Sequence, residues 1–300
     1  MLLLTGATGL VGSALLHRLT SSGEPVRCLV RDPRRLGADR VRVQIALGDL
    51  ADPPSFRNAL RGVRTVIHLA AAIRDQRAGS IEELNGIATW RMVEAAERGG
   101  VEHFVYFSSL GATSHDRTRF MRAKALAERA VADSPMRHTI FAPSIVYAPG
   151  DRFMTLMERI AMLTPVMPIS GRGEAMYEPI WAEDVADCVM AALGLAQGQA
   201  APANGRERYE LAGPDRLSHQ QIIALLLRAA GRQRPMVNVP SPIVSRALHA
   251  VETLMKSRAP ATWDEAELME VSMIARAGTA DVEALGVAPR PMAAVLGVPD

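Results

Sequence analysis

The sequence is poor in cysteine, which excludes several classes of protein. Its 300 residues include two cysteines, Cys28 and Cys188, and both lie in apolar surroundings. Two such residues form no disulfide framework, and neither has another metal ligand at a useful spacing. We therefore predict two buried thiols, no metal site and a reducing, cytoplasmic location.

Long apolar runs and blocks of one charge are also missing from the sequence. No stretch approaches the roughly 18 apolar residues that a membrane span requires. The apolar N-terminus lacks the basic start of a signal peptide, and glycines interrupt it. The net charge of +2, without a long basic block, predicts no nucleic-acid partner. A hydrophobic share of 48% in 300 residues suits one large soluble α/β domain, alone or with a smaller appendage.

What the sequence does contain is a strand, a glycine turn and a helix within its first 31 residues. An apolar run and an amphipathic pattern over 13–19 flank the segment Gly6, Ala7, Thr8, Gly9, Leu10, Val11 and Gly12. With a second apolar run at 26–30, this order predicts a dinucleotide-binding βαβ unit rather than a purely structural turn. We assign Gly6 to the turn, Gly9 to the approach of backbone N–H groups to a pyrophosphate, and Gly12 to close packing of the helix on the sheet.

Strand and helix patterns alternate through the first half of the chain. We expect strands at 1–5, 26–30, 41–47, 65–70, 103–107 and 137–141, with helices at 13–19, 54–60, 81–98 and 119–133. This alternation predicts an α/β fold with a doubly wound parallel sheet of the Rossmann type. The turn at Pro149-Gly150 then divides a dinucleotide-binding domain, 1–150, from a smaller substrate or partner region, 151–300, partly packed back on the sheet.

Ligands of such sheets bind beyond the carboxyl ends of the strands, so the residues that follow each strand are candidates. The second strand is followed by Arg31, Asp32, Arg34 and Arg35. An arginine here accommodates the 2′-phosphate of NADP, whereas an acidic residue binds the free ribose of NAD. We favour NADP over NAD, although Asp32 argues the other way and the segment can also be a solvated charged loop.

The third and fourth strands end in further candidates. Gly48, Asp49 and Leu50 follow the third strand, and the fourth ends in His68, Leu69, Ala70 and Ala71. The small residues let a nucleotide backbone lie close. Asp49 can equally cap the helix that follows, and we interpret His68 as a structural core histidine.

Several segments resemble the short-chain dehydrogenase/reductase superfamily, in its extended and atypical branches. The similarity rests on the glycine motif, Val30-Arg31-Asp32, Gly48-Asp49-Leu50, Ser108-Ser109-Leu110-Gly111, Arg122-Ala123-Lys124-Ala125 and Leu285-Gly286-Val287. The chain is most similar to bacterial relatives of the 39-kilodalton NADPH-binding accessory subunit of respiratory complex I. NmrA-type redox sensors and isoflavone-reductase-like enzymes share much of the first half.

The resemblance implies roles for residues along the whole cofactor. Asp49 and Leu50 would lie along the adenine ring, and Lys124 would hold the nicotinamide ribose. The segment Pro143, Ser144 and Ile145 would lie beside the nicotinamide. Ser108 or Ser109 would hydrogen-bond a substrate carbonyl, although epimerase-like members often carry that hydroxyl one place later, where this chain has Leu110.

The superfamily's Tyr-x-x-x-Lys motif is altered in this chain. It has Phe120 and Lys124, which share a helix face at i and i+4. In active members the phenol exchanges the proton that accompanies hydride transfer, and phenylalanine has none. None of the four tyrosines stands at the helical spacing that could replace it, so another donor, such as His115, Ser108 or bound water, would be needed.

Two function classes follow. In the first, which we favour, the chain binds NADP(H) as a structural or sensing ligand and assists a respiratory or quinone-linked assembly. In the second, it is an oxidoreductase or sugar-nucleotide epimerase/dehydratase that acts on a small carbonyl, quinone or sugar-nucleotide with another proton donor. An apolar face over 243–255 predicts a helix that packs on the domain, with peripheral membrane contact as the alternative. Oligomeric state is not predicted.

Overall fold

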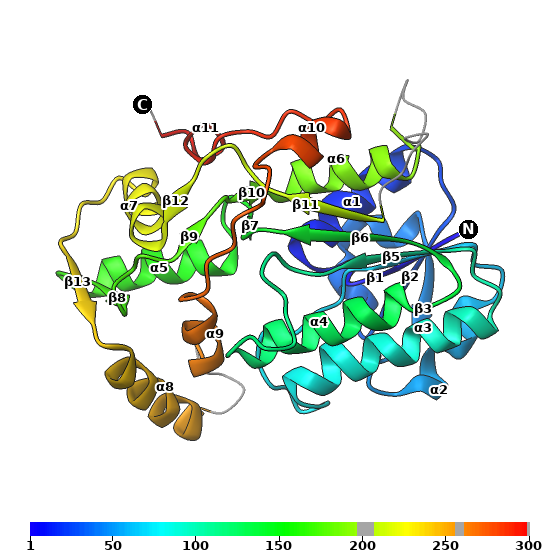
Figure 1. The fold of residues 1–300 in the computed structure, drawn as a ribbon, viewed down its shortest axis with the longest axis horizontal. Helices are drawn as coiled ribbons and strands as arrows, with labels where there is room; N and C mark the ends of the chain where they lie inside the picture. The colour runs from blue at the N-terminus through cyan, green and yellow to red at the C-terminus, as the bar shows by residue number, and fades with distance from the viewer. Residues whose placement is uncertain (197–206, 256–260, 299–300) are drawn as a thin grey trace.

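A seven-stranded parallel sheet forms the centre of the protein, seen in a computed structural model that describes residues 1–196, 207–255 and 261–298 (Figure 1). The strand order is β11-β6-β5-β4-β1-β2-β3. The strands are β1 (Leu2–Thr5), β2 (Val26–Val30), β3 (Gln44–Leu47), β4 (Thr65–His68), β5 (His103–Phe107), β6 (Arg137–Pro143) and β11 (Arg208–Leu211). The predicted doubly wound α/β fold is confirmed.

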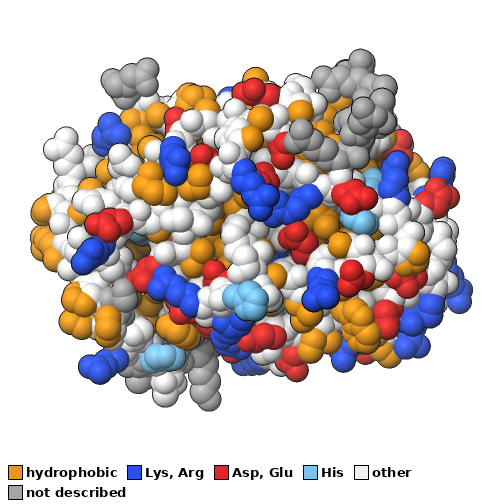
Figure 2. Space-filling view, in the orientation of Figure 1, with side chains coloured by type: hydrophobic (Ala, Val, Ile, Leu, Met, Phe, Trp, Pro, Cys, Tyr) orange, Lys and Arg blue, Asp and Glu red, His pale blue; other side chains and the backbone are white. Residues whose placement is uncertain are grey.

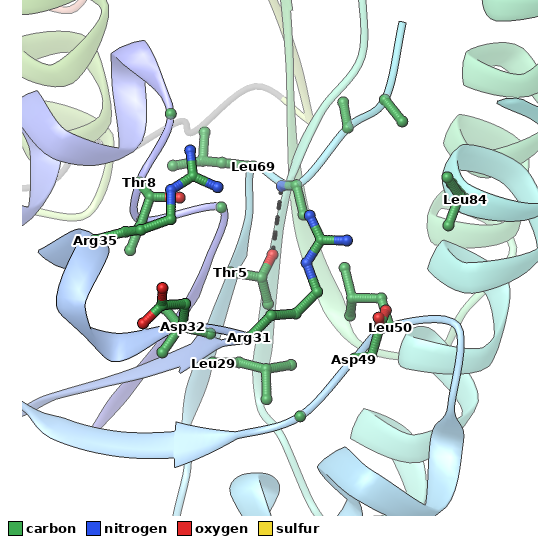
Figure 3. Close-up of a pocket in the computed structure, with 18 of the residues that line it drawn as sticks. Thr5, Thr8, Leu29, Arg31, Asp32, Arg35, Asp49, Leu50, Leu69 and Leu84 are labelled. Atoms are coloured by element: carbon green, nitrogen blue, oxygen red, sulfur yellow. Dashed lines mark hydrogen bonds between the residues drawn. The ribbon is translucent and has the colours of Figure 1, made fainter. Parts of the chain in front are cut away.

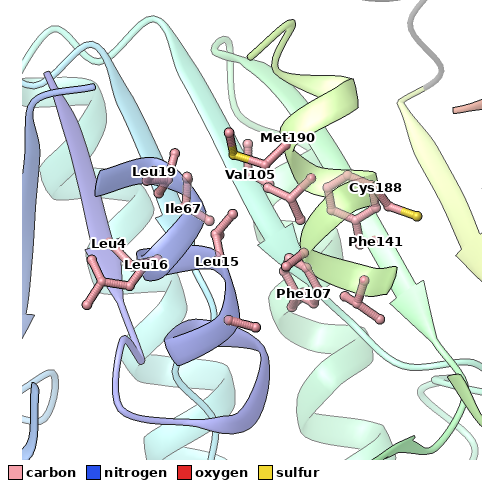
Figure 4. Close-up of a cluster of buried hydrophobic side chains, with 14 of the residues drawn as sticks. Leu4, Leu15, Leu16, Leu19, Ile67, Val105, Phe107, Phe141, Cys188 and Met190 are labelled. Carbon is pink, nitrogen blue, oxygen red and sulfur yellow. The ribbon is translucent and has the colours of Figure 1, made fainter. Parts of the chain in front are cut away.

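Helices cover both faces of this sheet because their apolar residues recur on one side. On one face, α1 (Leu10–Ser21) and α6 (Ala182–Ala192) pack on a core that includes Leu15, Leu19 and Ile67 (Figure 4). The other face carries α3 (Ala88–Arg98), α4 (Arg119–Ala132) and the short helices α2 (Pro53–Phe56) and η2 (Arg57–Leu60).

The second half of the chain contributes to the sheet domain as well as to a smaller lobe. Helix α6 packs along α1, where Arg18 pairs with Asp187 at 2.5 Å and with Glu183. Strand β11 extends the sheet beside β6, in register with residues 140–143. Helix α6 and strand β11 therefore belong to the same packed unit as the first 150 residues.

The smaller lobe consists of helices and three two-stranded ladders. The ladders pair β7 (Val146–Tyr147) with β10 (Ile180–Trp181), β8 (Met167–Ser170) with β13 (Met236–Val239), and β9 (Met176–Tyr177) with β12 (Leu217–Ser218). Among the described residues, the helices of this lobe are α5 (Arg152–Leu163), α7 (His219–Ala229), α8 (Ser241–Met255), α9 (Trp263–Leu268) and α11 (Met292–Leu296). Helix α10 (Ala280–Ala284) instead packs on β11 of the central sheet. Helix α8 packs against α9.

Several boundaries differ from the sequence expectations for physical reasons. The third strand begins at Gln44 because a 3-10 helix, η1 (Pro33–Val41), precedes it. The helix expected from 81 begins with a π-helical turn, η3 (Glu83–Ile87), which turns Asn85 inward. The polar segment 197–206 lies outside the described residues.

Two further features bear on partners. Within the described ranges, no helix is both long and apolar enough to cross a membrane. Acidic and basic side chains are interspersed on the face shown in Figure 2, without a broad patch of one sign. This mixture agrees with the small net charge.

Candidate functional site

A pocket of about 320 Å³ opens at the carboxyl ends of β1, β2, β3 and β4 (Figure 3). Most of the predicted cofactor residues line it, namely Gly6, Ala7, Thr8, Gly9, Arg31, Arg35, Asp49, Leu50, Leu69, Ala70 and Ala71. They come from four strand ends that are distant in sequence. The structure therefore brings the adenosine and phosphate part of the predicted site together in one cavity.

The glycine turn needs its glycines because the chain folds tightly on itself. Gly6 has a φ of +73°, and an added Cβ there would lie 2.7 Å from the Ala70 nitrogen. A Cβ on Gly12 would lie 2.0 Å from the Gly6 carbonyl oxygen. The close neighbour of Gly12 is thus the turn, whereas we expected the sheet. A Cβ on Gly9 would meet only the Gly6 oxygen, at 3.3 Å, so its other side is open.

Helix α1 begins at this turn without a side-chain cap. Gly9 is the N-cap residue and has no side chain that could accept from the first-turn N–H groups. The Ser13 hydroxyl donates to the Gly9 carbonyl at 2.9 Å and does not cap them either. Such groups, together with the helix dipole, form an anion site. The predicted cofactor residues Leu10, Val11 and Gly12 are not among the residues that line the pocket.

At the end of β2 the arginines and the aspartate have different environments. The Asp32 carboxylate accepts from the Arg34 backbone N–H and from its Nε, both at 3.0 Å, and the Arg34 side chain holds the pKa of Asp32 below its usual value. Arg31 donates to the Gln76 side chain at 3.1 Å across the pocket. Figure 3 shows Arg35 extending toward Thr8, and Arg31 toward the end of β4. Two guanidinium groups therefore line the pocket while Asp32 is occupied.

Asp49 takes part in a local turn as well as in the pocket wall. Its Oδ1 accepts from the Ala51 N–H at 3.0 Å, and its own N–H donates to the Ser55 hydroxyl at 2.9 Å. Its Oδ2 has no hydrogen-bond partner among the residues that the structure describes. One oxygen thus fixes the turn, and the other can accept a hydrogen bond from a ligand.

A buried hydrogen-bond chain supports the floor of the pocket. The Thr89 hydroxyl donates to the Asn85 carbonyl, so it must accept from Nε2 of His68, 3.0 Å away. The other ring nitrogen, Nδ1, then accepts from the Thr5 hydroxyl at 2.9 Å. Burial lowers the pKa of His68 to about 3, so the ring is neutral. The Asn85 side chain accepts from the Ala72 N–H and donates to the Ala72 carbonyl. His68 is therefore a core histidine that fixes the ends of β1 and β4.

The residues predicted for the nicotinamide end lie outside this pocket. Lys124 is buried, donates from Nζ to the Phe107 carbonyl, and lies 5.7 Å from the centroid of the Phe120 ring. Burial lowers the pKa of Lys124 to about 7. The Ser108 hydroxyl is buried and has no partner among the described residues.

An apolar cluster lies near Lys124 and the end of β5. Leu110 and Phe120 belong to it together with Met273, which comes from the C-terminal part of the chain. The Met273 carbonyl accepts from the Ser144 hydroxyl at 2.7 Å, and its sulfur lies 3.9 Å from the Ser109 hydroxyl. The segment around Met273 therefore covers the ends of β5 and β6, beside Pro143 and Ile145.

Some pocket residues were missed by the sequence analysis. Thr5, Leu29 and Val30 lie at strand ends, where position alone could have indicated them, while Ala72, Gln76 and Leu84 complete the lining. Gly48 and Asp32, both considered above, also line the pocket. Gln76 and Leu84 come from the loop after β4 and from η3, and no local sequence pattern marks them.

A doubly wound sheet with a glycine turn and a pocket at its strand ends defines a dinucleotide-binding protein of the Rossmann class. The family model described as NAD(P)H-binding matches residues 6–194, and the chain belongs to this family. The resemblance to atypical short-chain dehydrogenases/reductases is thereby confirmed, and with it the binding of a nicotinamide nucleotide.

Relatives include an NADH dehydrogenase subunit and a reductase. The chain is 28% identical over 265 residues to the mitochondrial NADH dehydrogenase [ubiquinone] 1 alpha subcomplex subunit 9 of Arabidopsis thaliana, covering 85% of this chain and 64% of that protein. It thus spans slightly less than two thirds of that relative. It is also 28% identical over 241 residues to the NAD(P)H azoreductase of Xenophilus azovorans, covering 77% of this chain and 74% of the azoreductase.

Solved structures share the fold at lower sequence identity. The NADPH-dependent quinone oxidoreductase QOR2 of Escherichia coli, complexed with NADPH, superimposes with a TM-score of 0.71 at 18% identity, covering 99% of each chain. This likeness supports the architecture alone.

Proposed function

We propose that the protein binds NADP(H) as a sensing or structural ligand, without turning it over, and serves as an accessory factor. The pyrophosphate rests against the glycine turn and the first turn of α1, and the adenosine occupies the cavity toward Asp49 and Leu50. The uncapped helix start and the open side of Gly9 support this arrangement.

The preference for NADP over NAD rests on the end of β2. Arg31 and Arg35 line the pocket, and each can form a charge-assisted contact to a 2′-phosphate. Asp32, the group that would bind a free ribose, is engaged by Arg34. The site thus offers cations to the phosphate and no free carboxylate to the ribose of NAD.

The proposal that the nucleotide is not turned over rests on the apolar cluster around Leu110, Phe120 and Met273. A carbonyl that receives hydride becomes an alkoxide and needs a proton from a nearby acid. Phe120 stands at the position of the superfamily's tyrosine, and Leu110 at the position where epimerase-like members often carry a hydroxyl. Ser109 and Ser144 face Met273 instead of a free cavity.

One observation favours the second candidate function, an NADP-dependent oxidoreductase. Burial lowers the pKa of the Lys124 ammonium to about 7, which suits a proton donor at neutral pH. The other candidate donor, His115, is exposed in the loop before α4. A quinone, carbonyl or sugar-nucleotide substrate would then have to displace Met273. The relative named as an azoreductase makes this alternative worth testing.

Parallel binding and turnover measurements distinguish the two functions. A fluorescence titration with NADPH should saturate, while NADPH absorbance should stay constant with a panel of quinones, aldehydes, ketones and azo compounds. Consumption near about 10 per second with any of them would overturn the accessory function. Absence of saturable binding would overturn both candidates.

The accessory role is proposed for a respiratory or quinone-linked assembly in the cytoplasm. The support is the similarity to the plant subunit and the two buried free thiols, Cys28 and Cys188, which suit a reducing compartment. Co-purification of the tagged chain from its own cells, followed by mass spectrometry, tests the role. Recovery without respiratory or quinone-reducing subunits would contradict it.

A further inference from the structure

Among the described residues, one edge strand of the central sheet is covered by other parts of the chain, and the other edge strand is open. At the β11 edge, the Glu210 N–H donates to Asp281 of α10 at 2.8 Å, and the Glu210 carboxylate accepts from the Arg276 N–H at 2.8 Å. Helix α10 packs against this strand. At the opposite edge, β3 pairs with β2 on one side, and no described strand pairs with its other side.

The outer side of β3 presents unpaired backbone groups. Gly48, directly after the strand, donates its N–H to the Val30 carbonyl of β2 at 3.2 Å. Successive residues of a strand turn their N–H and C=O groups to opposite sides. The N–H and C=O groups of Gln44 and Ala46 therefore point toward β2, whereas those of Ile45 and Leu47 point outward.

The same two residues expose their side chains. Ile45 is 41% exposed and Leu47 is 64% exposed, and Val41, just before the strand, is 81% exposed. The four strand residues include neither a charge nor a proline, the devices that usually protect an edge strand from pairing. Open backbone groups and exposed apolar side chains thus coincide at Ile45 and Leu47.

We propose that β3 is the dimer interface of this protein, and that its occupant is β3 of a second copy, paired antiparallel across a twofold axis. A twofold axis perpendicular to the sheet keeps each face on the same side, so it can set Ala46 opposite Ala46 of the other copy. Ile45 then lies opposite Leu47 of the other copy, and all four outward residues form hydrogen-bonded pairs.

This register is self-complementary in two respects. Each outward N–H meets an outward C=O, and each exposed Ile45 meets an exposed Leu47 on the same face. A cross-strand apolar pair of this kind adds roughly 0.2–1 kcal/mol. A peptide strand from an unrelated protein would satisfy the hydrogen bonds but has no reason to supply this repeated apolar pair. The pattern therefore favours a second copy.

Sedimentation velocity over about a hundredfold range of protein concentration tests the interface. The native chain should shift from one to two copies, and Leu47→Lys should weaken dimerisation at least about tenfold, because it buries a charge opposite Ile45. Leu163→Lys changes another exposed leucine, on α5 and 84% exposed, and should leave the dimer intact. A native chain that stays monomeric, or a dimer insensitive to Leu47→Lys, overturns the proposal. NADPH titration of each variant verifies folding.

A single engineered cysteine tests the register. In the proposed pairing, the two copies of Ala46 form a non-hydrogen-bonded pair with Cα atoms about 4.5 Å apart, within disulfide range. Ala46→Cys should form a covalent dimer under mild oxidation. Ile45→Cys should not, because its two copies lie diagonally, about 7–8 Å apart. The native thiols are buried and do not compete. Cross-linking through residue 45 and not 46 would overturn the register.

Discussion

In the proposed binding mode, single residues of the pocket recognise different parts of the nucleotide. Arg31 and Arg34 lie three positions apart, but Arg31 reaches across the pocket to Gln76, whereas Arg34 is held by Asp32. Both are exposed arginines of one segment, so they form a matched pair for mutation. The difference between them isolates the contact to the 2′-phosphate.

Arg31→Ala should weaken NADPH binding about tenfold or more while changing NADH binding little. A charge-assisted hydrogen bond contributes roughly 1.5–3 kcal/mol, and only NADPH carries the phosphate that receives it. Arg34→Ala is the control and should retain the preference, because its guanidinium is bound to Asp32. Titrations with both nucleotides measure the ratio, and equal losses from Arg31→Ala would contradict the assignment to NADP.

Gly9 and Gly12 should respond differently to substitution although both belong to the glycine turn. Gly9→Asp brings a carboxylate to the open side of the turn and should abolish NADPH binding with little loss of stability. Gly12→Ala places a Cβ against the Gly6 carbonyl, so it should lower the melting temperature as well as the affinity. Unchanged affinity in the Gly9 variant would remove the pyrophosphate from this turn.

At the scale of elements, sequence patterns predicted what local periodicity determines. Alternating runs predicted six of the seven strands of the central sheet. The place of β11 could not be predicted, because a four-residue strand acquires its partner only through long-range packing. The same reason explains why Gln76 and Met273, which come from a loop and from the tail, were missed, while the glycine turn and Arg31 were found.

Helix α4 buries Lys124 beside aromatic rings, and this position has a pH signature. Burial lowers the pKa of Lys124 from 10.5 to about 7, so between these values the unfolded chain binds more protons than the folded one. The contribution of Lys124 to stability therefore rises with pH across this window. Below pH 7 the folded state bears the full penalty of a buried charge.

Lys124→Met should flatten this dependence. The free energy of unfolding of the native chain minus that of the variant should increase as pH rises from 7 to 10.5, as measured by urea denaturation at several pH values. Nucleotide binding through the adenosine pocket should persist, because Lys124 lies outside it. A difference that is constant over pH would mean that the ammonium is not buried.

At the scale of the whole molecule, ion pairs join the smaller lobe to the loop that lines the pocket. Arg74 follows β4 and binds Glu265 of α9 through two nitrogens, at 2.5 and 3.0 Å from Oε1, with side chains only 15% and 17% exposed. Glu265 also accepts from the Thr262 N–H at the start of α9. This pair holds the C-terminal segment, including Met273, over the ends of β5 and β6.

Glu265→Gln should therefore destabilise the protein by about 2–3 kcal/mol, since it removes the carboxylate charge that faces a largely buried guanidinium. Glu102→Gln breaks the exposed pair with Arg64, whose side chains are 60% and 73% exposed, and should change stability by less than about 1 kcal/mol. Thermal or chemical denaturation compares the two. Similar losses of stability in the two variants would mean that the Arg74–Glu265 pair does not stabilise the contact between the lobe and the sheet domain.

The proposed mode of nucleotide binding is tested by a crystal structure of the protein with NADPH. We expect the pyrophosphate against the N–H groups that follow Gly9, the 2′-phosphate within hydrogen-bond distance of Arg31, and no phenol or imidazole beside the nicotinamide. A nucleotide bound away from the glycine turn would contradict the site. A phenol or imidazole positioned over the nicotinamide would contradict the absence of turnover.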